Sequence, residues 1–135
     1  MAFLYWSEEL SANIVEVDMQ HQKLVAVLND LHSAMMECKG DEVLGKIINE
    51  LAEYTVYHFA TEEGLFDKFD YPGAAIHKAQ HADFIERVSD FRDRFASGEA
   101  ALSIVMLDFL AGWVREHIRI SDRKFGPFLN NCGVY

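Results

Sequence analysis

Two pairs of metal-ligand residue types stand in the middle of the sequence and constrain its fold. His58 is followed four residues later by Glu62, and His77 is followed four residues later by His81. Four residues turn an α-helix by about 400°, so each pair projects from one helix face, about 6 Å apart along the axis. A Pro-Gly turn at residues 72–73 separates the two pairs. The sequence therefore predicts two antiparallel helices that direct both pairs into one site.

Apolar residues recur at helical spacing through most of the chain, and no strand signal interrupts them. Asp18 and Asp41 are predicted N-caps, and Gly40 is a predicted helix stop. The expected helices cover residues 19–39, from after Asp41 to before Pro72, 74–96, and from 102 until the pattern fails near Ser121, with Gly126-Pro127 closing the fold. Short loops between these helices predict an all-α fold, an antiparallel up-down-up-down four-helix bundle. The length predicts a single domain, residues 1–135.

Residues 1–17 show no clean period but are rich in apolar side chains, among them Phe3, Leu4 and Trp6. A solvated tail would not keep so much apolar surface in water. We therefore expect an ordered N-terminal arm that lies on the body of the bundle.

The net charge and the cysteines restrict the partners and the compartment. A formal charge of −10 argues against nucleic acid or an anionic membrane as a partner. No apolar run approaches the roughly 20 residues needed to span a bilayer, and no signal segment is present at the N-terminus. Cys38 and Cys132 lack zinc-type spacing and are interpreted as free thiols of a reducing compartment. We expect a cytoplasmic protein that contacts neither nucleic acid nor a membrane.

A third pair of ligand types stands near the C-terminus, where His117 precedes Asp122 by five residues. Five residues turn an unbroken α-helix by about 500°, so this pair would not share a face. The two side chains converge only if the helix ends or unwinds between them, and the helical pattern fails at residues 120–121.

The first helix offers two histidines on the same face, His21 and His32. In an antiparallel bundle the start of the first helix lies beside the end of the second, where His58 and Glu62 stand. His21 is at that end, whereas His32 is about 16 Å further along the axis. We therefore select His21 as a ligand and interpret His32 as a flank or core residue.

Five imidazoles and two carboxylates exceed the four ligands of a single structural zinc site, and they suit two metals bridged by carboxylates. Imidazole with carboxylate is a donor set that suits iron, among other first-row metals. Two octahedral metals offer twelve positions, of which the side chains fill nine and a bridging oxide or hydroxide fills two. One position stays open for a small ligand such as O2.

This ordered set resembles the ligand set of the hemerythrin family, specifically the bacterial hemerythrins. The resemblance covers nearly the whole chain, including an aromatic arm with Trp6 and the Trp113 that precedes the last histidine. The matching positions are His21, His58-x3-Glu62, His77-x3-His81 and His117-x4-Asp122.

The resemblance implies a cofactor of two non-haem iron ions with an oxo or hydroxo bridge. It implies that Glu62 and Asp122 bridge the ions. It also implies that one iron is held by His77, His81 and His117, and the other by His21 and His58. O2 is the implied small-molecule ligand. Val114 is smaller than the leucine of invertebrate carriers at this place, which changes the expected pocket size. The expected walls of the O2 pocket are Trp113, Val114, Ile118 and Phe59.

Three functions are compatible with this ligand set. The first is reversible O2 binding, as a carrier or a store. The second is O2 or redox sensing, as in domains appended to chemotaxis-type signalling proteins, which would require a partner domain if this chain belongs to a larger receptor. The third is a di-iron oxidase, peroxidase or nitric oxide reductase. Ferritin-like oxidases use four carboxylates and two histidines, and the reversed ratio here favours reversible binding by a protein that is not an enzyme.

Overall fold

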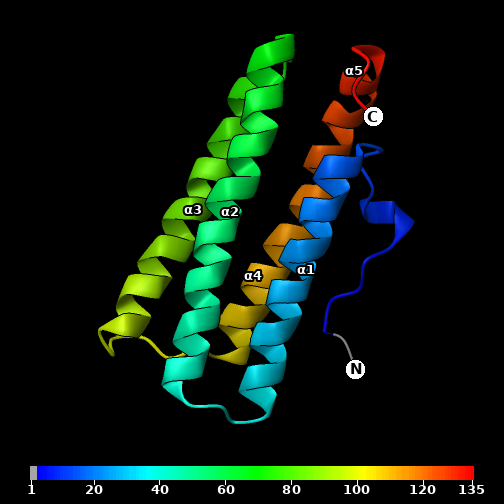
Figure 1. The fold of residues 1–135 in the computed structure, drawn as a ribbon. Helices are drawn as coiled ribbons and strands as arrows, with labels where there is room; N and C mark the ends of the chain where they lie inside the picture. The colour runs from blue at the N-terminus through cyan, green and yellow to red at the C-terminus, as the bar shows by residue number, and fades with distance from the viewer. Residues whose placement is uncertain (1–2) are drawn as a thin grey trace.

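The computed structural model describes residues 3–135 as a bundle of long antiparallel helices (Figure 1). Helices α1 and α2 pair along their length, α2 pairs with α3, and no strand occurs within the described range. The predicted all-α, up-down-up-down arrangement is confirmed. None of these helices combines the length and apolar character needed to cross a bilayer. The elements are η1 (Glu8–Leu10), α1 (Val15–Met36), α2 (Asp41–Phe69), α3 (Ala74–Ala96), α4 (Ile104–Glu116), η2 (His117–Asp122) and α5 (Arg123–Asn131).

The bounds of α2 and α3 agree with the prediction to within a residue, although the N-cap of α2 is Gly40 and not Asp41. Helix α1 begins earlier than expected. Asp18 does not cap it. Its carboxylate instead accepts hydrogen bonds from Ser11 Oγ at 2.5 Å and Ala12 N at 2.8 Å, and so ties the arm to the helix. At the other end α1 stops at Met36, where the left-handed turn is made by Cys38 (φ 55°) and not by Gly40.

The prediction that the last helix fails near Ser121 and that Gly126-Pro127 closes the fold is wrong. The chain stays helical, widening into the π-helix η2 and then continuing as α5 with Pro127 inside it. Gly126 faces the arm, and a Cβ at this position would collide with the carbonyl oxygen of Ala12. The glycine therefore serves close packing between α5 and the arm rather than a turn.

The arm is ordered over residues 3–14 and lies along the bundle (Figure 1). Asn29 Oδ1 accepts hydrogen bonds from Phe3 N at 3.0 Å and Leu4 N at 2.7 Å, and Asn29 Nδ2 donates to Leu4 O at 2.8 Å. Leu10 is buried in the bundle core, and Trp6 packs against it. The arm prediction is confirmed for these residues. Residues 15–17 belong to α1, and Met1 and Ala2 lie outside the described residues.

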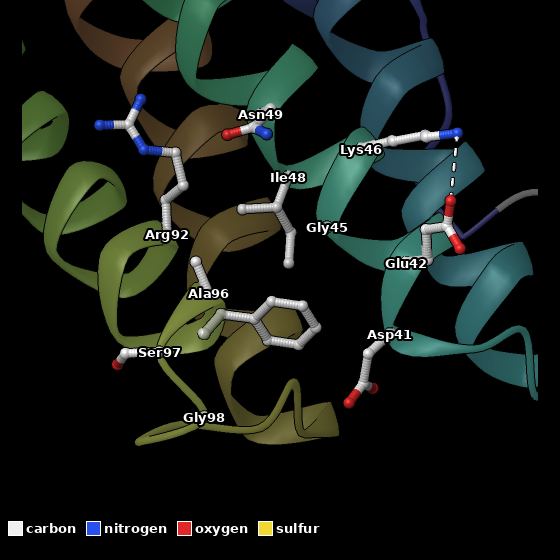
Figure 2. Close-up of a pocket in the computed structure, with 11 residues that line it drawn as sticks. Asp41, Glu42, Gly45, Lys46, Ile48, Asn49, Arg92, Ala96, Ser97 and Gly98 are labelled. Carbon is white, nitrogen blue, oxygen red and sulfur yellow. Dashed lines mark ion pairs between the residues drawn. The ribbon is translucent and has the colours of Figure 1, made fainter.

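The end of the bundle that carries the α1–α2 and α3–α4 connections is called the loop end here. A cavity of about 530 Å³ opens there between α2 and α3 (Figure 2). Its charged lining includes Asp41, Glu42, Lys46 and Arg92, with Lys46 paired to Glu42 at 3.8 Å. No histidine or cysteine lines it, so it offers none of the soft or borderline donors that transition metals prefer.

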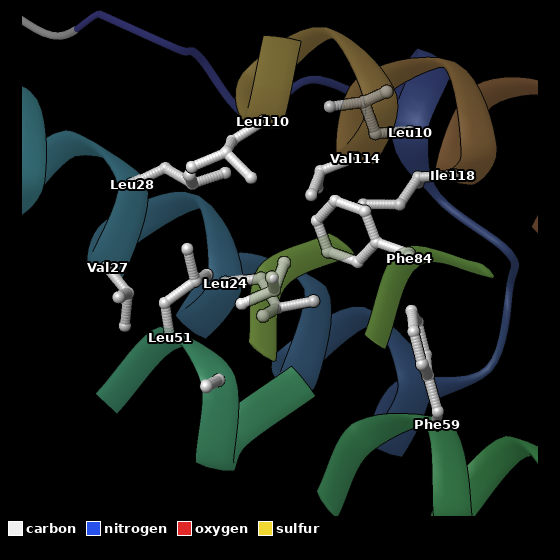
Figure 3. Close-up of a cluster of buried hydrophobic side chains, with 12 residues drawn as sticks. Leu10, Leu24, Val27, Leu28, Leu51, Phe59, Phe84, Leu110, Val114 and Ile118 are labelled. Carbon is white, nitrogen blue, oxygen red and sulfur yellow. The ribbon is translucent and has the colours of Figure 1, made fainter. Parts of the chain in front are cut away.

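Three groups of buried apolar side chains run along the bundle. The first occupies the loop end, the second the middle (Figure 3), and the third the opposite end, where α5 and the arm meet. The candidate ligands lie between the middle group and the third group, which keeps water away from them. The loop-end group is Leu31, Ala34, Leu44, Ile48, Phe91 and Leu107; the third group is Ala12, Ile14, Val17, Phe66, Phe125 and Leu129.

Candidate metal centre

All seven predicted ligand side chains converge, and each is at most 6 % exposed. They form two overlapping groups whose ligand atoms lie within 4.8 Å of one another. Glu62 and Asp122 belong to both groups. The first group adds His77, His81 and His117, and the second adds His21 and His58.

The two oxygens of Glu62 face different groups of histidines. Oε1 lies 3.1 Å from His81 Nε2 and 3.4 Å from His77 Nε2. Oε2 lies 2.9 Å from His58 Nε2 and 3.2 Å from His21 Nε2. The carboxylate therefore spans the two groups.

Asp122 spans them in the same way. Its Oδ1 lies 2.9 Å from His77 Nε2 and 3.1 Å from His117 Nε2. Its Oδ2 lies 2.8 Å from His21 Nε2. Two carboxylates thus connect a three-histidine position to a two-histidine position.

The π-helix η2 brings the last pair of ligands together. It begins at His117 and ends at Asp122. Its hydrogen bonds run from residue i to residue i+5, so residues five apart return to one face. The predicted condition, a departure from the α-helix between the two residues, is met by widening of the helix and not by its termination.

The donor atoms fit a transition metal better than they fit one another. Buried polar atoms normally have hydrogen-bond partners, yet several here have none. Inside the cluster those atoms are His58 Nε2, Glu62 Oε1 and both oxygens of Asp122. In addition, His117 Nε2 lies 3.1 Å from the Nε2 atoms of both His77 and His81. Lone pairs that converge in this way suit metal coordination, and the mixture of imidazole and carboxylate suits iron.

Without metal, protons on two of the histidines supply the positive charge that a metal ion would supply. Burial lowers the pKa of His21 and of His77, but the adjacent carboxylates of Asp122 and Glu62 outweigh it and raise both values to about 9. Burial opposes ionisation of the two carboxylates. The nearby histidines outweigh burial and hold the pKa values of Glu62 and Asp122 well below their usual range. Positive charge is therefore favoured between two buried carboxylates.

Two residues outside the ligand set hold ligands in place. Glu63 accepts a hydrogen bond from His81 Nδ1 at 2.9 Å. Gln20 was not predicted, and its Oε1 accepts one from His58 Nδ1 at 2.7 Å. Each contact joins two helices, so no spacing within one helix reveals it.

Two of the four predicted pocket residues contact ligand rings, and the other two belong to the middle apolar group. Phe59 stacks on His81 with ring centroids 3.7 Å apart, and Trp113 stacks on His117 at 4.6 Å. Figure 3 shows Val114 and Ile118 directed toward the same middle group as Phe59. Trp113 and Val114, one turn before His117, therefore pack in the core, and Trp113 also contacts a ligand ring.

His32 lies away from the cluster, as predicted. It is partly exposed, and its ring stacks on Phe3 with centroids 4.5 Å apart. The placement of His21 at the other end of α1 agrees with the argument from bundle topology.

Comparison with known proteins agrees with this arrangement. Residues 12–129 match the family model of the hemerythrin HHE cation binding domain. The chain belongs to the hemerythrin family. Members of this family bind O2 at a non-haem di-iron centre.

Relatives in several bacteria share most of the length of this hemerythrin-family chain. A bacteriohemerythrin of Stenotrophomonas maltophilia is 38 % identical over 125 residues, covering 93 % of this chain and 80 % of that protein. The bacteriohemerythrin of Methylococcus capsulatus is 31 % identical, covering 96 % and 99 %. A solved structure of wild-type hemerythrin is 30 % identical and superimposes with a TM-score of 0.89 over 93 % of this chain and 97 % of that one.

Proposed function

We propose that the seven buried side chains hold two non-haem iron ions with an oxo or hydroxo bridge, and that this centre binds O2 reversibly. The observation that carries the proposal is the division of the oxygens of Glu62 and Asp122 between the three-histidine and two-histidine positions. A carboxylate that faces two sets of imidazoles is suited to bridge two metals.

The side chains have distinct roles in this proposal. The carboxylates would bridge the two ions, and each set of histidines would hold one iron. The two-histidine position has one protein donor fewer, so it would leave room for a small ligand. When bound, the ferrous ions would supply the electrons that O2 draws on.

The surroundings of the site favour reversible binding over oxidase chemistry. Neutral imidazoles outnumber carboxylates, so higher oxidation states of the metals are less stabilised than in carboxylate-rich oxidases. Phe59, Val114 and Ile118 are buried apolar residues with Trp113 packed against them, and in this proposal they would keep water from the side where a small ligand lies. We therefore propose a binding protein and not an enzyme.

The direct test records the visible spectrum of the iron-loaded protein. The protein is reduced without oxygen, exposed to air and then purged with argon. Colour that forms in air and fades under argon is the expected result. Colour that relaxes within seconds to a stable oxidised spectrum would favour redox sensing or oxidase chemistry. No colour despite two irons per chain would contradict the proposal.

The ligand assignment is tested by His58→Ala, with His32→Ala as the matched control on a histidine outside the site. His58→Ala is expected to lose one iron per chain and O2 binding, whereas His32→Ala keeps both. Iron is counted by elemental analysis. A His58→Ala protein that retained two irons and O2 binding would refute the assignment.

A sensing role is the second candidate, and the position of the arm favours it. Trp6 lies with its ring 6.4 Å from that of His21, so the arm contacts the region of the two-histidine position. Such a protein would act as an O2- or redox-sensing module for a chemotaxis-type signalling partner. Limited proteolysis of the oxygenated and deoxygenated forms tests this role, and equal protection of the arm in both would count against it.

We also propose a cytoplasmic location. Cys38 and Cys132 are both free and exposed, and exposed thiols suit a reducing compartment. Fractionation of cells that produce the protein tests this, and recovery from the cell exterior would contradict it.

A further inference from the structure

At each of the two metal positions, the Nδ1 atom of one histidine, which points away from the cluster, donates a hydrogen bond. The two positions differ in the group that accepts it. At the three-histidine position, His81 Nδ1 donates to the carboxylate of Glu63 at 2.9 Å. The Glu63 side chain is 32 % exposed and the His81 side chain only 1 %. This is a charge-assisted hydrogen bond to a buried ring.

At the two-histidine position, His58 Nδ1 donates to a neutral amide oxygen, that of Gln20, at 2.7 Å. The amide is oriented by its other end, because Gln20 Nε2 donates to Thr61 Oγ1 at 3.3 Å. Thr61 in turn donates to the carbonyl oxygen of Tyr57 at 3.3 Å. Gln20 is only 6 % exposed, so this chain of hydrogen bonds fixes which nitrogen of His58 is free to bind metal.

We propose that Glu63 and Gln20 are positioning residues that give the two irons unequal reduction potentials. This inference rests on the proposed di-iron site and extends it. Glu63 favours the ferric state at the three-histidine position, and Gln20 leaves the two-histidine position easier to keep ferrous. The open coordination position is thus on the iron that holds its electron more firmly until a ligand arrives.

The sign follows from the chemistry of imidazole. A carboxylate that accepts the Nδ1 proton draws it away from the ring and makes Nε2 a stronger electron donor to the metal. A stronger donor stabilises the higher oxidation state. A neutral amide fixes the orientation of the ring equally well but adds much less donor strength.

The chain allows this difference to be tested by changing charge without changing shape. Glu63→Gln keeps an oxygen that can accept from His81 but removes the negative charge. Gln20→Glu keeps the acceptor for His58 and adds a charge. The matched controls are Glu53→Gln on α2 and Gln22→Glu on α1, which make the same changes at exposed positions.

The measurement is a spectroelectrochemical titration of each iron-loaded protein, together with the rate of iron(II) release to a chelator. Glu63→Gln is expected to raise one potential and Gln20→Glu to lower one. Each shift corresponds to about a tenfold change in the ferric-to-ferrous ratio, or about 59 mV for a one-electron couple. The controls are expected to match the unmodified protein.

Opposite shifts in the two variants support the inference, since loss of structure alone would move both in one direction. Shifts of the same sign, or none, would overturn it. Failure of the proposed function is distinguishable from failure of this inference. If the reduction potentials of the two variants shift in opposite directions but the protein shows no reversible colour with O2, the inference stands and the O2-binding role is refuted. A chain that binds no iron refutes both.

Discussion

The two ends of the bundle use the same helices for different purposes. The loop end is filled by aliphatic and aromatic side chains such as Leu44, Ile48 and Phe91, each at most 8 % exposed. The opposite end, called the histidine end here, buries five histidines and two carboxylates at the same depth. Burying apolar surface stabilises the fold directly, whereas burying charge costs free energy unless a partner compensates it. The histidine end therefore depends on its internal ion pairs, or on a bound cation, to offset the cost of burial, and the loop end needs neither.

Removing metal should produce the largest contrast between the two ends. A metal that binds only the folded state stabilises it by about 4 kcal/mol at a concentration 1,000 times its dissociation constant. Metal removal should lower the melting temperature and increase amide exchange near His58 and His77. Exchange around Ile48 should change little. Uniform loss of protection along α2 would show that the two ends unfold as one unit.

A cavity at the loop end should give the converse result. Ile48 is 1 % exposed, so Ile48→Ala should cost about 2–5 kcal/mol. The protein should still bind two irons, because no ligand contacts this region. Denaturant unfolding and elemental analysis measure the two quantities. Val43→Ala, at an exposed position on the same helix, is the control and should cost much less. Loss of iron from Ile48→Ala would mean that loop-end packing shapes the metal site.

Features that are local to one regular helix could be predicted from the sequence. The bounds of α2 and α3 and the pairs His58–Glu62 and His77–His81 are local features of a regular helix, so periodicity finds them. The position of His21 required only the antiparallel order of the helices.

Features that depend on contacts between elements were not predictable in the same way. The widening of the helix between His117 and Asp122 leaves only a lapse in the apolar pattern, which equally fits a helix end. Gln20 and Glu63 contact histidines on neighbouring helices, and their positions in the sequence carry no sign of it. Asp18 has the sequence context of an N-cap, but its carboxylate binds the arm.

Proton release on metal binding should separate the pH responses of the metal-loaded and metal-free protein. His21 and His77 have pKa values near 9 in the metal-free fold, raised from 6.5, and only the neutral ring binds metal. One such histidine belongs to each metal position. Each affinity should therefore rise about tenfold per pH unit from pH 7 toward 9. Chelator competition at several pH values measures this, and a flat profile would contradict it.

The metal-free fold should respond with the opposite sign. Because folding raises these two pKa values, protonated His21 and His77 stabilise the fold fully below about pH 6.5, and that stabilisation is lost as the pH rises through about 9. Thermal unfolding across this range measures it. A metal-free melting temperature that rose between pH 7 and 9 would show that the carboxylates do not hold these protons.

The smallest of these effects concerns how the histidine end is closed. A Cβ at Gly126 would meet the carbonyl oxygen of Ala12, and Ala12 cannot retreat easily because its N–H is held by Asp18 at 2.8 Å. Gly126→Ala should therefore cost about 1–3 kcal/mol. The matched control is Gly112→Ala in α4, where a Cβ meets nothing within 4 Å and alanine should be neutral or stabilising.

Iron release from the same two variants shows whether this packing also seals the site. Ala12 and the neighbouring Phe125 belong to the apolar group that covers the ligands on the side of α5. If that group excludes water from the histidine end, Gly126→Ala should release iron to a chelator faster, and Gly112→Ala should not. Destabilisation without faster release would mean that the arm and α5 support the fold but do not seal the site. Equal stability of the two variants would mean that Ala12 yields, and that this end of the bundle is less rigid than the loop end.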